Sequence, residues 1–69
     1  MDTQKLTIGA KVKKWRKIKE MTQDELSKKA DIPYPTLVKI ESGAVNNPSI
    51  ETMMKIANGM GVTLDELIK

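Results

Sequence analysis

Residues 23–42, QDELSKKADIPYPTLVKIES, contain two short helical patterns separated by a break. In the first pattern, Leu26 and Ala30 lie one helical turn apart on one face. In the second, Leu37 and Ile40 also share a face. The Asp-Ile-Pro turn between them is so short that the two helices cannot lie side by side and must cross steeply. One face of the second helix is therefore predicted to remain free for contact with another molecule.

The turn combines one strained position with two prolines. Asp31 stands where a left-handed backbone is expected, at a cost of ~1 kcal/mol compared with glycine. Pro33 and Pro35 are compatible with the start of the second helix, because the first turn of a helix needs no internal N–H bonds. Tyr34 has polar or rigid neighbours, and we expect its ring to be exposed.

Capping signals and apolar spacing predict helices in the rest of the chain. Thr22 with Glu25, and Thr63 with Glu66, have the spacing of capping boxes at helix starts. No β-hairpin signal is present, so five helices account for the chain. The expected helices are residues 8–20, 23–30, 34–42, 49–60 and 64–68.

Two of these helices have further details that the structure can test. Thr7 or Thr3 is expected to cap the first helix, and Pro48 or Ser49 opens the fourth. The apolar face of the fourth helix is expected to consist of Ile50, Met53, Ile56, Ala57 and Met60.

Length and composition restrict the class of protein. A chain of 69 residues is expected to form a single domain over residues 1–69, with a core over 8–68. It contains no cysteine and no histidine, which removes disulfides, thiolate metal sites and the commonest general base. No apolar run has transmembrane length and no signal peptide is evident, so we expect a cytoplasmic protein. The start at Met1 favours a complete chain over an excised domain.

Charge is distributed unevenly along the chain. The net charge is +3, yet residues 1–39 hold ten Lys and Arg against five Asp and Glu, whereas residues 40–69 hold two against four. Six of the cations fall within residues 11–19. A polyanion bound on the basic side would explain this asymmetry, and a solvated basic helix would explain it equally well.

The order and spacing of several motifs resemble the lambda-repressor-like, Cro-type (XRE-like) helix-turn-helix DNA-binding domains. The resemblance covers roughly residues 8–68 and implies an all-α, compact orthogonal five-helix bundle, with residues 34–42 as the recognition helix in the DNA major groove. The matching motifs are Arg16, Thr22-Gln23-x-Glu25-Leu26, Ala30-x-Ile32, Leu37-x-x-Ile40-Glu41-x-Gly43, Asn47-Pro48-Ser49-Ile50-Glu51-Thr52 and Gly61-Val62-Thr63-Leu64-Asp65-Glu66-Leu67.

The resemblance also implies roles for individual residues. Arg16 and Glu41 are expected to form an ion pair between the first and third helices, the alternative being that Arg16 is one more basic surface residue. The expected contacts to DNA bases are Tyr34, Pro35, Thr36 and Lys39, and the expected contacts to DNA phosphates are Gln23, Ser42, Asn46 and Asn47.

Three departures from the family pattern affect these expectations. Asp31 replaces the usual glycine of the turn, and Pro33 replaces the usual capping serine or threonine. Pro35 lies within the recognition surface and can offer only apolar contact, such as to a thymine methyl group. The loop over residues 44–47 lacks the cations often found there, which weakens the expectation of a phosphate clamp.

The predicted function is therefore a sequence-specific, double-stranded-DNA-binding transcriptional regulator, a repressor-type protein associated with the nucleoid. A single domain has a small footprint on DNA, so a homodimer on a palindromic operator is expected. The dimer surface is predicted in the C-terminal part, unless the same side chains simply complete the core. They are Val45, Met60, Leu64, Ile68 and Ile18.

The alternative is an antitoxin or adaptor that uses the same fold mainly to bind another protein. DNA binding through lysines predicts a steep loss of affinity with salt, and an apolar protein interface does not. An enzyme is disfavoured because the carboxylates at helix starts are explained by capping. No cofactor, metal, small-molecule ligand or membrane is expected as a partner.

Overall fold

The computed structural model describes residues 7–69, and within them five helices and no strands. The helices are α1 (Ile8–Ile18), α2 (Gln23–Ala30), α3 (Tyr34–Ser42), α4 (Ile50–Met60) and α5 (Leu64–Ile68).

The first helix, α1, has the expected N-terminal cap but ends earlier than predicted. Thr7 Oγ1 accepts a hydrogen bond from Ala10 N at 3.1 Å, whereas Thr3, the other expected cap, lies outside the described residues. The helix ends at Ile18 rather than at Glu20 as predicted. Glu20 has a φ of 57°, so its left-handed backbone turns the chain toward α2.

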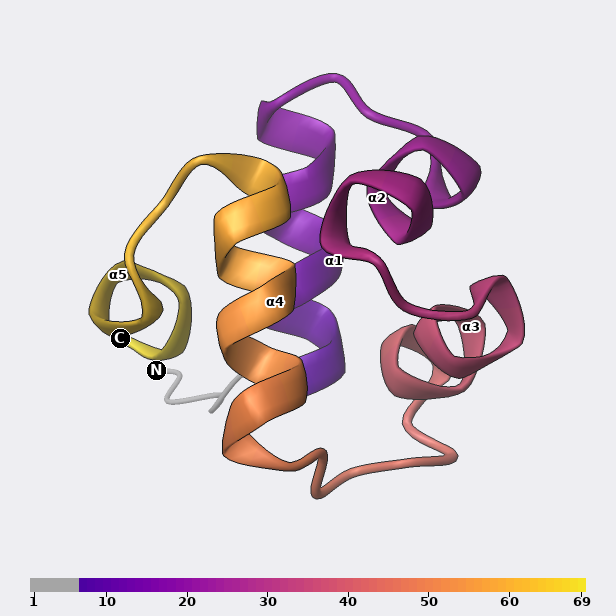
Figure 1. The fold of residues 1–69 in the computed structure, drawn as a ribbon. Helices are drawn as coiled ribbons and strands as arrows, with labels where there is room; N and C mark the ends of the chain where they lie inside the picture. The colour runs from indigo at the N-terminus through magenta and orange to yellow at the C-terminus, as the bar shows by residue number, and fades with distance from the viewer. Residues whose placement is uncertain (1–6) are drawn as a thin grey trace.

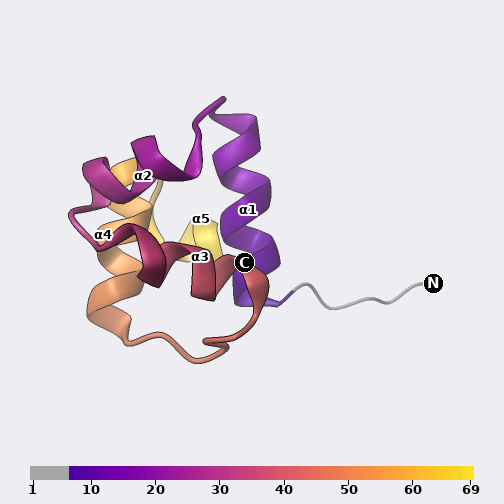
Figure 2. The same ribbon diagram turned by 90° about the vertical axis from the view of Figure 1, so that its right-hand side faces the viewer.

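The five helices form an all-α bundle in which α1 and α4 are central and the other three helices lie on either side of them. Figure 1 shows α4 in front of α1, with α2 and α3 to one side and α5 to the other. The most extensive packing joins α2 to α4, and α1 contacts both α3 and α5. Because α3 is held mainly by α1 and α2, its other side remains at the surface (Figure 2).

The core draws on all five helices and on the segment before α5. The buried apolar residues are Val12, Leu26, Ala30, Leu37, Ile40, Met53, Ile56, Ala57, Met60, Val62 and Leu67. The predicted apolar face of α4 is correct except at Ile50, which is 63% exposed. Ile50 is the first residue of α4 and lies at the edge of the buried stripe, one turn from the exposed Met54.

Two glycines permit close approaches between helices. A Cβ atom on Gly9 would lie 2.1 Å from the carbonyl oxygen of Ile40, so α1 packs directly against the backbone of α3. A Cβ atom on Gly59 would lie 2.9 Å from the backbone nitrogen of Ala30, where α4 meets the end of α2. Neither close approach could be predicted, because contact between distant backbone segments leaves no local pattern in the sequence.

The connection between α2 and α3 has the predicted left-handed residue. Asp31 has φ 59° and ψ 46°, and Ile32 N donates to the Ser27 carbonyl at 3.0 Å. The Ile32 side chain then packs against the core. Pro33 supplies no side-chain cap, but its carbonyl accepts from Thr36 N at 3.0 Å and so begins α3.

Candidate nucleic-acid interface

One side of α3 is buried and the other is presented to solvent. Leu37 and Ile40 are buried against the bundle, at 0% and 1% exposure. Tyr34 is 47% exposed, as expected for its ring. Figure 2 shows α3 at the near surface of the molecule, below α2. Pro35 and Lys39 are also exposed, and Thr36 is half-buried. The four residues expected at base edges therefore lie on one helix, which the core holds in place.

The ion pair expected from the family resemblance is present. Arg16 Nε donates to Glu41 Oε2 at 2.8 Å, and Arg16 Nη2 donates to Glu41 Oε1 at 3.1 Å. The two side chains are only 12% and 3% exposed. Arg16 Nη1 also donates to the carbonyl of Met21 at 2.7 Å. This planar, two-pronged contact joins α1, the end of α3 and the chain that enters α2.

Gln23 extends this contact toward the surface of α3. Its Nε2 donates to Glu41 Oε1 at 3.1 Å, and its Oε1 accepts from the Tyr34 hydroxyl at 3.5 Å. The side-chain amide that was expected at a phosphate is thus bonded within the protein. At the first position of α2, the backbone N–H of Gln23 has no acceptor inside its own helix and remains suitable for an anion.

The other three expected phosphate contacts differ in how free their side chains are. Ser42 Oγ donates to the Lys39 carbonyl at 3.1 Å and accepts from Ala44 N at 3.3 Å, so it closes the end of α3. Asn46 and Asn47 are exposed in the loop that leads to α4. The side chains of the two asparagines can therefore donate hydrogen bonds to a phosphate directly. Ser42 would first have to give up its hydrogen bond to the Lys39 carbonyl.

The basic residues of α1 and α2 are not all equally available. Lys11 Nζ donates to the Ile68 carbonyl at 2.7 Å, and Lys19 lies over the Trp15 ring at 5.9 Å from its centroid. Lys28 pairs with Asp24 at 3.2 Å, in an exposed contact of small energetic value. Several cations of the basic N-terminal part of the chain therefore have intramolecular partners.

Carboxylates at helix starts act as caps. Thr22 N donates to Glu25 Oε1 at 2.8 Å, and Thr63 N donates to Glu66 Oε1 at 2.9 Å. Two hydrogen bonds hold the pKa of Glu66 below its usual value. The larger effect comes from the backbone N–H of Thr63, and the smaller comes from the Thr63 hydroxyl. Between residues 7 and 69, no group of three or more Cys, His, Asp or Glu side chains is arranged to hold a metal ion.

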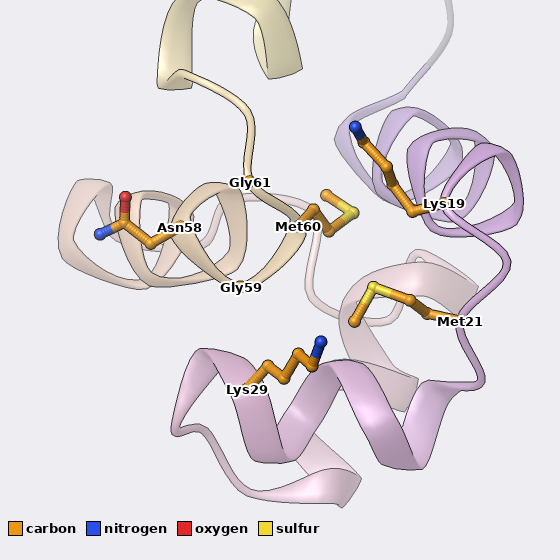
Figure 3. A pocket seen from close by; sticks show the side chains of 7 residues that line it. All are labelled: Lys19, Met21, Lys29, Asn58, Gly59, Met60 and Gly61. Atoms are coloured by element: carbon orange, nitrogen blue, oxygen red, sulfur yellow. The ribbon is translucent and has the colours of Figure 1, made fainter.

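A groove lies between the C-terminal ends of α1, α2 and α4, and α3 does not contribute to it. Figure 3 shows Met21 and Met60 at its centre, while the amide of Asn58 points away. Its lining residues are Lys19, Met21, Lys29, Asn58, Gly59, Met60 and Gly61.

No helix in the described part of the chain is both long and apolar enough to cross a membrane.

Comparison with known proteins relates this geometry to a family. Residues 12–67 match the family described as helix-turn-helix. The chain is 30% identical over 63 residues to an immunity repressor protein of Bacillus phage phi105, covering 91% of this chain but only 43% of that protein. It is 35% identical over 68 residues to control protein C.MunI of a Mycoplasma species, covering 97% of this chain and 90% of that protein.

A solved structure shows the same fold. SinR of Bacillus subtilis, a master regulator for biofilm formation, has been crystallised in complex with DNA. Its structure superimposes with a TM-score of 0.84 at 32% sequence identity, covering 90% of this chain and 98% of that one.

Proposed function

Because the chain belongs to the Cro/XRE-type helix-turn-helix family, we propose that it is a sequence-specific regulator of transcription that binds double-stranded DNA. The observation that carries this proposal is the polar outer face of α3, held on a rigid base by the Arg16–Glu41 pair. Helices fixed in this way can enter the major groove and present side chains to base edges. The likeness to SinR, which was solved with DNA, supports the same conclusion.

Each base-reading residue contributes a different chemistry. Lys39 donates to guanine O6 and N7, and Thr36 donates to or accepts from a neighbouring base. Pro35 makes an apolar contact that suits a thymine methyl group. Tyr34 contributes a ring and a hydroxyl at the start of the helix. These residues select the sequence, and other groups determine how the protein docks.

Phosphate contacts on either side of α3 set the docking angle. The backbone N–H of Gln23 and the positive end of α2 face one strand, and Asn46 and Asn47 face the backbone beyond the other end of α3. Ser42 adds a contact when its hydroxyl leaves the Lys39 carbonyl. Exposed lysines of α1 add attraction that acts over a longer range.

The regulator acts as a homodimer on a palindromic operator. Two copies double the base contacts that one small domain can make. Ile18 and Ile68 are 56% and 42% exposed, and Leu64 and Val45 are half-buried, which supports their place in a dimer surface. Met60, which was predicted in the same surface, is 4% exposed and belongs to the core. For Met60 the alternative therefore holds, in which its side chain on the apolar face of α4 completes the core.

The proposal is tested by selecting duplexes from a random pool at two salt concentrations. The native protein should enrich a palindrome, and a variant with Thr36→Ala and Lys39→Ala should lose that preference, since each base contact is worth about 1–3 kcal/mol of discrimination. The control is Lys55→Ala, which removes one positive charge from α4 and should leave the preference unchanged.

Two outcomes would contradict this function. Weak, salt-sensitive binding without any enriched sequence would show that α3 attracts DNA only through its charge and does not recognise bases. Enrichment of a sequence that the double variant retains would show that Thr36 and Lys39 do not determine the sequence preference. In the first case we would infer that the protein is an adaptor that binds another protein.

The loop asparagines provide a separate prediction. Asn46→Ala combined with Asn47→Ala should weaken binding to every duplex by about tenfold, because two hydrogen bonds to phosphate are lost. Ser42→Ala should have a smaller effect, because its hydroxyl is committed to the Lys39 carbonyl. Equilibrium binding to the selected operator and to an unrelated duplex measures both. A change in sequence preference, rather than a uniform loss, would show that the loop contacts bases.

A further inference from the structure

Four side chains from three helices form a continuous hydrogen-bonded chain. It begins at the Arg16–Glu41 pair, passes through the Gln23 amide and ends at the Tyr34 hydroxyl. The inner end is buried, with the Glu41 side chain 3% exposed, and the outer end lies on the exposed face of α3. The chain thus connects a fixed charge in the protein to a group on the recognition surface.

The chemistry of each group determines the direction of these hydrogen bonds. The Glu41 carboxylate can only accept, and it already accepts two bonds from Arg16. Gln23 must therefore turn its NH₂ group toward Glu41, and its carbonyl oxygen then faces Tyr34. An amide oxygen can only accept, so the Tyr34 hydroxyl is the donor in its long, 3.5 Å contact with Gln23.

The direction of this contact determines what Tyr34 offers to a partner. With its proton directed to Gln23 at 3.5 Å, the hydroxyl oxygen presents lone pairs to the surroundings. In the DNA major groove, the base groups that donate hydrogen bonds are the amino groups of adenine (N6) and cytosine (N4). Guanine and thymine present acceptors at the corresponding positions.

We propose that Gln23 is a positioning residue that orients the Tyr34 hydroxyl as a hydrogen-bond acceptor, so that Tyr34 favours adenine or cytosine at one operator position. This inference rests on the proposed function and specifies which class of base one residue selects. It also gives the Gln23 side chain a role inside the protein, and leaves only its backbone N–H for a phosphate.

The experiment compares Gln23→Met, Tyr34→Phe and native protein by selection from random duplexes. Tyr34→Phe removes only the hydroxyl, and Gln23→Met removes the amide that orients it. Both should reduce the native preference for adenine or cytosine, expected to be about 5- to 150-fold, to near equality at the same base position. Asn58→Leu, which removes an exposed amide from α4, serves as the control and should keep the full preference.

A chemical variant of the operator tests the acceptor directly. Removing the amino group from the base at that position should weaken native binding and leave Tyr34→Phe binding unchanged. Because Gln23→Met also takes a partner from Glu41, its thermal unfolding is measured first. Tyr34→Phe keeps the inner hydrogen bonds, so it tests the proposal even if Gln23→Met is unstable.

The outcomes separate this inference from the proposed function. A native protein that selects no sequence overturns both. A native protein that selects an operator in which no position depends on Tyr34, or in which that position prefers guanine or thymine, overturns the inference alone. A uniform loss of affinity in Gln23→Met, with the base preference intact, would identify its side chain as a phosphate ligand and also overturn the inference.

Discussion

Replacing Gly9 with alanine is expected to lower the free energy of unfolding by about 3 kcal/mol, which is large for the addition of one methyl group. The added Cβ would lie 2.1 Å from the Ile40 carbonyl oxygen and 3.0 Å from that of Glu41. Both neighbours are backbone atoms, so no side-chain rotation can relieve the overlap. The two helices α1 and α3 would have to separate.

Helix propensity alone predicts the opposite sign for this substitution. Alanine is favoured over glycine inside a helix by about 1 kcal/mol, and Gly9 is the second residue of α1. The steric overlap outweighs this gain, because moving α1 also disturbs the Arg16–Glu41 contact between the same helices. Separation of α1 and α3 should therefore weaken DNA binding as well as stability.

Urea unfolding measures the change, and a second glycine provides the control. A Cβ atom on Gly61 would meet nothing within 4 Å, and its φ is 72°. Gly61→Ala should therefore cost only the left-handed backbone strain of about 1–2 kcal/mol. A Gly9→Ala protein as stable as the native one would show that α1 and α3 are not in direct backbone contact.

The second large effect is expected from the Arg16–Glu41 pair. Glu41→Ala should destabilise the protein by about 3 kcal/mol, because it leaves the Arg16 guanidinium without its carboxylate in a site of low exposure. Arg16→Met should cost a similar amount, since Glu41 would remain buried with only Gln23 as its side-chain partner. Surface ion pairs such as Lys28–Asp24 should contribute at most about 1 kcal/mol.

A double-mutant cycle distinguishes a true pair from two independent losses. The protein with both Arg16→Met and Glu41→Ala should be more stable than the sum of the single effects predicts, by about 1–3 kcal/mol. This follows because the double variant no longer buries an unpaired charge. Strictly additive free energies from urea unfolding would mean that the two side chains do not interact, and Lys28→Ala with Asp24→Ala supplies the matched exposed pair.

Several features of the site could be predicted because they depend on nearby residues or on a recurrent motif. The capping boxes join residues three apart, and the left-handed Asp31 follows from the end of one helix pattern beside the next. The bounds of α3 agree with the prediction of residues 34–42. The Arg16–Glu41 pair spans 25 residues and was expected only through the family resemblance.

Features that depend on distant packing were not predictable in this way. The partner of the Gln23 amide lies 18 residues away, so the sequence suggested a phosphate, whereas the fold provides Glu41. Met60 is buried and Ile50 is exposed, although both satisfy the same apolar spacing in α4. The difference is set by which helix lies beside each turn, and periodicity does not contain that information.

The helices, their caps and the outward face of α3 follow from local sequence, because hydrogen bonds over three or four residues and helical periodicity set them. The close approach at Gly9 and the contacts from Glu41 through Gln23 to Tyr34 exist only in the folded protein. Both arise where α1, α2 and α3 meet. Their geometry depends on packing between helices, which brings residues far apart in the chain within hydrogen-bonding distance.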